Sequence, residues 1–189
     1  MCKFAQCAVR YRFRRGGGRH CGDDGTIALV TVSTGRRTEL RRPPAGRLGA
    51  AHVRVDAFEL ALLRQRLVPT PADIAGHGCD LALAAADTCF GAGADVVVDA
   101  VFPVAASRRP FRELAARHDT PVHWLRLICT DPAEHRRRVE ERVADLPGHV
   151  LPDWTAARRR EVDQWHERHT VVDTATGDPV AAVLAALRG

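Results

Sequence analysis

The chain has 189 residues, of which 46% are apolar and 27% are charged. This length suits one domain with a sizeable core, and the apolar fraction excludes a largely disordered chain. No apolar run approaches the roughly 20 residues that cross a bilayer, and no stretch resembles a signal peptide. We therefore expect a cytoplasmic protein with no membrane partner, whose six cysteines are reduced thiols.

The basic charge is concentrated at the N-terminal end. The chain carries 28 Lys and Arg against 23 Asp and Glu, a net charge of +5, and Lys3 is its only lysine. Residues 1–50 contribute +8 and the remainder −3. A basic arm that binds nucleic acid is one interpretation of this excess, but we favour a solvated tail. Residues 1–25 have no apolar periodicity, which predicts an irregular extension before a domain at 26–189.

Five short apolar segments are predicted to be β-strands. The first, at residues 27–32, is a continuous run of apolar and β-branched residues, as expected for a strand that is buried on both faces. The other four segments follow at residues 52–55, 95–99, 122–129 and 170–173.

Helices are predicted between these strands, at residues 72–91, at 104–118, from 132 onward and at 180–188. The third has a strong start signal: Asp131 as N-cap, Pro132 at the first helical position and Glu134 completing a capping box. Trp154 and Trp165 are predicted to be packing anchors on a further helix. Strands that alternate with helices predict an α/β fold with a mainly parallel five-stranded sheet and helices on both faces.

Acidic residues follow two of the predicted strands, and an arginine-rich segment follows a third. Asp56 and Asp99 stand at the carboxyl ends of their strands, where sheets of this kind bind ligands. Residues 135–142 contain four arginines on a predicted helix. Carboxylates can hold Mg²⁺ or take a proton from a hydroxyl, and arginine can neutralise a transferring phosphate. The pattern therefore indicates a site for a phosphate ester and a metal ion.

Three segments in order resemble a known family of enzymes. They are residues 53–56, a strand that ends in an acid; residues 91–100, a glycine turn and a second strand that ends in an acid; and residues 124–142, a strand that leads into a helix with the spacing Arg-x-x-x-Arg. From about residue 45 to its end, the chain resembles the small P-loop kinases of the group containing zeta toxin, chloramphenicol phosphotransferase and polynucleotide-kinase-like ATP-binding proteins.

The resemblance implies a three-layer P-loop NTPase-like fold and phosphoryl transfer from ATP, with Mg²⁺, to a hydroxyl of a small molecule or nucleotide. It implies that Asp56 is the general base and that Asp99 helps to hold Mg²⁺ through water. Arg138 and Arg142, on one face of a helix, would stabilise the charge on the transferred phosphate.

Each of these residues also has a structural interpretation. Asp56 could cap the helix that follows its strand, and Asp99 could satisfy a strand end. Arg138 and Arg142 could belong to a solvated helix face, as most exposed arginines do.

The nucleotide-binding loop departs from the pattern of these kinases, G-x-x-x-x-G-K-[ST]. Only Gly35 remains of the glycines, and Arg37-Thr38 stands where Lys-[Ser/Thr] is expected. These three residues are the candidate phosphate ligands, and Thr38 is also the candidate hydroxyl ligand of Mg²⁺. Pro43 and Pro44 fall inside the expected next helix, where each costs about 3 kcal/mol. The alternative function is therefore a catalytically impaired remnant of a kinase, folded but with weak or no nucleotide binding.

Overall fold

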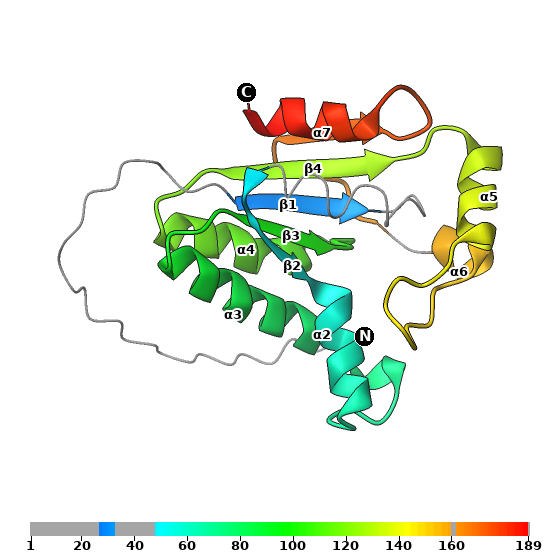
Figure 1. Ribbon diagram of the computed structural model, residues 1–189, viewed down its shortest axis with the longest axis horizontal. Helices are drawn as coiled ribbons and strands as arrows, with labels where there is room; N and C mark the ends of the chain where they lie inside the picture. Colours follow the sequence, from blue (N-terminus) through cyan, green and yellow to red (C-terminus); the bar gives the residue numbers. More distant parts are fainter. Residues whose placement is uncertain (1–26, 33–47, 160–161, 189) are drawn as a thin grey trace.

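The computed structural model describes residues 27–32, 48–159 and 162–188, and a sheet of five strands forms its centre (Figure 1). The strands are β1 (Ile27–Val32), β2 (Ala51–Arg54), β3 (Val96–Ala100), β4 (Val122–Ile128) and β5 (His169–Asp173). Their order is β2-β3-β1-β4-β5, and every neighbouring pair is parallel. The predicted parallel sheet is confirmed. The predicted extension, residues 1–25, lies outside the described residues.

Helices cover both faces of the sheet, as predicted (Figure 1). On one face lie α3 (His77–Gly91) and α4 (Ala105–Arg117), and on the other lies α7 (Pro179–Arg188). Successive side chains of β3 alternate between these layers: Val96 and Val98 share a core with Leu114 of α4, whereas Val97 packs with Val183 of α7. Burying such a valine fully contributes about 1.5–3 kcal/mol, so both faces stabilise the fold.

The second strand is shorter than predicted. Strand β2 ends at Arg54, and helix α2 (Val55–Arg64) begins at Val55, which we expected in the strand. Pairing between β2 and β3 stops at Arg54 opposite Asp99. The Val55 side chain is buried in the same core as the strand residues, so its apolar character does not distinguish a strand from a first helical turn.

The helix predicted over 72–91 is divided in two. A short 3₁₀ helix, η1 (Pro71–Asp73), precedes α3, and Ala75 between them has a positive φ of 47°. A non-glycine residue in this left-handed region cannot continue an α-helix. The alanine- and leucine-rich composition predicted the longer part of the helix but not this break.

Trp165 lies on an irregular segment rather than on the predicted helix. Its ring packs edge-on against Trp124 with centroids 5.8 Å apart, and the guanidinium carbon of Arg108 lies 4.5 Å from its centroid. Arg108 is fully buried and donates hydrogen bonds to the Phe102 carbonyl oxygen and the Glu167 carboxylate. Tertiary contacts therefore hold this segment, and the predicted packing role of Trp165 is confirmed.

Helices α5 (Pro132–Glu141) and α6 (Trp154–Arg158) lie beyond the carboxyl ends of the strands (Figure 1). The Asp131 side chain accepts hydrogen bonds from the backbone N–H groups of Ala133 and Glu134, which confirms the predicted N-cap. The Glu134 carboxylate instead bonds the guanidinium groups of Arg137 and Arg138, so its predicted part in a capping box is wrong. The two arginines offer this carboxylate charged donors, which bind it more strongly than a backbone amide.

The described cysteines are thiols. Cys79, Cys89 and Cys129 are free, and burial raises the pKa of the Cys79 thiol to about 11. Within the part of the chain that the structure describes, no helix is long and apolar enough to cross a bilayer.

Candidate active site

Two neighbouring strand ends bring the predicted acids to one edge of the sheet. Strands β2 and β3 run in parallel with Arg54 opposite Asp99, and Asp56 follows two residues after Arg54. The carboxyl edge of such a sheet is where its ligands bind. The two acids therefore lie at neighbouring strand ends, on the edge where the sequence predicts the candidate site.

Asp56 lies in the first turn of α2, and its side chain is only 8% exposed. Both of its oxygens accept hydrogen bonds from Arg54: Nε lies 3.1 Å from Oδ1, and Nη2 lies 3.0 Å from Oδ2. The ring atom Nδ1 of His149 lies 4.0 Å from Oδ2. A helix N-terminus and a guanidinium both favour the ionised carboxylate, which is the form that can accept a proton.

Arg54 also holds the connection between α5 and α6, residues 142–153. Its Nη1 lies 2.7 Å from Oδ2 of Asp145, and its Nη2 lies 3.3 Å from Oδ1. Burial acts to lower the pKa of Arg54, but hydrogen bonds to Asp145 and Asp56 outweigh it and raise the pKa. The guanidinium is therefore a permanent cation between two carboxylates.

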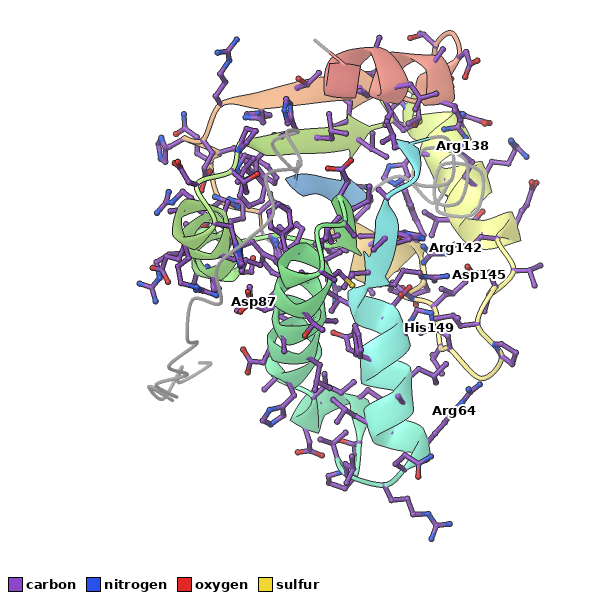
Figure 2. All side chains as sticks on the ribbon, turned by 60° about the vertical axis from the view of Figure 1, so that its left-hand side comes forward. Arg64, Asp87, Arg138, Arg142, Asp145 and His149 are labelled. Carbon is purple, nitrogen blue, oxygen red and sulfur yellow. The ribbon has the colours of Figure 1, made fainter. Side chains whose placement is uncertain are left out.

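A second arginine, on helix α2, contacts this connection. Arg64, the last residue of α2, donates a hydrogen bond to the Pro147 carbonyl oxygen. Figure 2 shows Asp145 and His149 in the space between α2 and the connection, with Arg64 farther along the helix. The 142–153 connection is thus seated on α2 at several points, close to Asp56.

Asp99 is nearly buried, with 4% of its side chain exposed, and its Oδ2 lies 3.6 Å from Nε2 of His52. A carboxylate is the ligand type that Mg²⁺ prefers, and Mg²⁺ is commonly held by one or two carboxylates together with substrate phosphates. Among the described residues there is no group of three or more His, Cys, Asp or Glu side chains that could hold a metal by themselves. A single strand-end carboxylate fits a Mg²⁺ ion that arrives with a nucleotide.

Arg138 is a buried anchor rather than part of a solvated helix face. Its side chain is 8% exposed; Nε donates to Glu134, and the two Nη atoms donate to the hydroxyl and the carbonyl oxygen of Thr174 at 3.0 and 3.1 Å. Its Nη1 also lies 3.7 Å from Sγ of Cys129. These bonds join α5 to the segments that follow β4 and β5.

Arg142 does not share a helical face with Arg138, so that prediction is wrong. Helix α5 ends at Glu141, and Arg142 has an extended backbone with φ −66° and ψ 139°. Its side chain donates a hydrogen bond to the Pro152 carbonyl oxygen across the 142–153 connection. The solvated face of α5 consists instead of Arg136 and Arg137, which are exposed and paired with glutamates of the same helix.

The candidate phosphate and Mg²⁺ ligands Gly35, Arg37 and Thr38 lie outside the described residues. Their assignment therefore remains a prediction from the sequence.

Arg54, Asp145 and His149 were not predicted as site residues. One feature of the sequence could have identified Arg54: it is a charged residue between two buried valines, just before an acid. Asp145 and His149 belong to a loop about ninety residues later in the chain and match no motif. Only the tertiary structure brings them to Asp56.

Neither the protein-family models nor the curated proteins gave a match to this chain. Solved structures do match. A proposed kinase from Chloroflexus aurantiacus shares 16% identity at a TM-score of 0.69, over 88% of this chain and 96% of that one. A sugar kinase from Janibacter sp. shares 18% identity at a TM-score of 0.60, over 88% and 95% of the two chains.

The APS kinase of Mycobacterium tuberculosis, solved with AMPPNP and APS, shares 14% identity at a TM-score of 0.57 over 88% of this chain and 98% of that one. The chain has the fold of small P-loop kinases. At these identities the likeness establishes the fold, which is the fold that the sequence predicted.

Proposed function

We propose that this chain is a kinase that transfers the γ-phosphoryl group of ATP to a hydroxyl of a small molecule or nucleotide. The observation that carries the proposal is the pair of acids, Asp56 and Asp99, at adjacent carboxyl ends of parallel strands in a kinase fold. One carboxylate can take the proton of the acceptor hydroxyl, and the other can bind the metal ion. Phosphoryl transfer needs both of these roles.

Asp56 is the proposed general base. As the acceptor oxygen attacks phosphorus, its proton passes to a carboxylate oxygen of Asp56, the new O–P bond forms, and the bond to the ADP oxygen breaks. Arg54 fixes both oxygens of this carboxylate through hydrogen bonds. Asp56 is 8% exposed and His149 of the 142–153 connection lies 4.0 Å from it, so the proposal includes a movement of this connection that admits the acceptor.

Asp99, with Thr38, is proposed to hold Mg²⁺, which when bound neutralises charge on the phosphates. The charge-stabilising role predicted for two arginines is assigned here to Arg142, which lies at the start of the 142–153 connection. Arg138 is already bonded to Glu134 and Thr174, so its proposed role is to anchor α5.

The test is transfer of labelled phosphate from Mg·ATP to a panel of hydroxyl compounds: hexoses, gluconate, adenosine 5′-phosphosulfate and nucleosides. The first three acceptors follow the names of a sugar kinase, a gluconokinase and an APS kinase that share the fold, and the nucleosides follow the nucleotide acceptor that the sequence resemblance implies. Phosphate transfer to one of these acceptors by the wild-type chain, lost in Asp56→Asn, supports the proposal.

Calorimetry with Mg·AMPPNP separates the kinase from the alternative. No detectable binding and no transfer to any acceptor would identify the chain as a catalytically impaired remnant, as the altered segment 36–44 allows.

A further inference from the structure

Arg54 uses both hydrogen-bonding edges of its guanidinium at once. The edge formed by Nε and Nη2 meets Asp56, and the edge formed by Nη1 and Nη2 meets Asp145. A guanidinium is planar, with its donors in a fixed fork, so the position of one carboxylate constrains the position of the other. Lysine has no such edges.

The carboxylates of Asp56 and Asp145 belong to parts of the chain that are 89 residues apart. Asp56 follows β2 at the sheet edge, whereas Asp145 lies on the 142–153 connection. Without the cation between them, two negative charges would face each other at short range, which opposes the seating of the connection. Arg54 converts this repulsion into attraction.

We propose that Arg54 is a positioning residue that couples the seating of the 142–153 connection to the orientation of Asp56. When the connection is seated, Asp145 holds the outer edge of the guanidinium and the inner edge aligns Asp56. When the connection leaves, only the inner pair, between Arg54 and Asp56, remains, and these two residues are two positions apart in the sequence. The catalytic consequence rests on the proposed function: the base is fully aligned only when the connection has closed over the acceptor.

The exposed fractions set the order in which the two pairs break. The Asp145 side chain is 25% exposed, whereas those of Arg54 and Asp56 are 16% and 8% exposed. Water competes more effectively for a more exposed ion pair, so the outer pair, between Arg54 and Asp145, opens first. The inner pair, two residues apart in sequence, stays with the sheet.

A double-mutant cycle tests the coupling without any need for activity. The reporter is amide hydrogen exchange at residues 146–150 of the full chain, where the His149 N–H donates to the Leu146 carbonyl oxygen at 3.0 Å. Asp56→Asn should speed this exchange about 3–10-fold, because the guanidinium loses its inner partner and holds Asp145 less firmly. In an Arg54→Ala background the same substitution should no longer speed the exchange and should instead slow it, because it removes a negative charge that then repels Asp145.

Arg64→Ala is the matched control, because Arg64 holds the same connection through Pro147 but does not touch Asp56. It should also speed the exchange, yet the effect of Asp56→Asn should persist in its background. If Arg54→Ala does not fold, Arg54→Lys replaces it, since lysine keeps the charge but cannot hold both carboxylates in one fork.

An effect of Asp56→Asn that is as large in the Arg54→Ala background would overturn the inference, because the coupling would then run through His149, 4.0 Å from Asp56. No effect of Asp56→Asn in the unaltered chain would overturn it as well.

The kinetic readout uses Mg·ATP with water as the acceptor. Arg54→Ala should lower kcat about 10-fold more than Arg64→Ala does, with the KM for ATP unchanged in both. Equal losses of kcat would show that Arg54 only holds the fold, and would overturn the positioning role. If the wild-type chain transfers phosphate neither to water nor to any acceptor of the panel, the proposed function fails, while the exchange cycle still decides the coupling.

Discussion

Arg138 of helix α5 donates hydrogen bonds to both the hydroxyl and the carbonyl oxygen of Thr174, which follows strand β5. A charged side chain that is 8% exposed thus ties the helix beyond the sheet to the end of an edge strand. An arginine in this position has little freedom to reach a phosphate. We therefore expect that replacing Arg138 mainly lowers the stability of the fold.

Arg138→Ala should therefore lower the free energy of unfolding by about 1.5–3 kcal/mol, since it leaves the Thr174 carbonyl oxygen without its charged donor and removes one of the two arginines that bond Glu134. For a chain of this size, each kcal/mol lowers the melting temperature by about 2–4 °C. Thermal melts followed by circular dichroism provide the measurement. Arg136→Ala, in an exposed pair, is the control and should change stability by less than about 1 kcal/mol. An unchanged melting temperature with lost phosphate transfer would instead restore Arg138 to the catalytic role.

Asp56→Asn and Asp99→Asn should have different kinetic effects. The first removes the base, so kcat should fall by roughly 10²–10⁴-fold with little change in ATP binding. The second should raise the Mg²⁺ concentration needed for half-maximal rate, because a carboxylate near the metal is lost. Steady-state rates measured across a Mg²⁺ titration separate the two. Equal, modest losses with lower melting temperatures would mean that both aspartates only hold strand ends.

The altered nucleotide loop should bind ATP far more weakly than an intact P-loop does. Replacing Arg36 with glycine and Arg37 with lysine, and Pro43 and Pro44 with alanine or leucine, should raise the affinity, because glycine exposes backbone N–H groups and lysine reaches the phosphates. Calorimetry with Mg·ATP on both chains is the measurement. Micromolar binding by the unaltered chain would contradict the prediction.

Glu134 should make the stability of α5 depend on pH in the acid range. Hydrogen bonds from Arg137 and Arg138 lower the pKa of this carboxyl to about 2, from an ordinary value of 4.5. A lowered pKa in the folded state means that the stabilisation is complete above about pH 4.5 and is lost as the pH falls toward 2. Glu134→Gln should therefore melt below the wild type at pH 6, and the difference should narrow between pH 4.5 and 2. A difference that is constant over this range would show that the ion pairs contribute nothing.

The sequence alone determined the architecture. Apolar, β-branched runs such as Val96–Ala100 are buried on both faces, and this burial requires a helix layer on each side and hence parallel strands. Start signals such as Asp131-Pro132 depend on neighbours within one turn, so they too could be predicted locally. Local signals failed where two structures share one pattern, as at Val55, where a buried valine suits a strand or a first helical turn.

Only the tertiary structure decided which partners the charged residues of the site have. Asp56 and Asp99 could be placed at strand ends from the sequence, because parallel strands end at one edge. The meeting of Arg54 with Asp145 could not, because it joins residues 91 apart through a loop that carries no motif. Arg138 likewise matched the Arg-x-x-x-Arg spacing of the resemblance, yet its burial against Thr174 depends on where α5 docks beside β5. Charge and spacing are local properties of a sequence, whereas the partner of a charge is set by long-range packing.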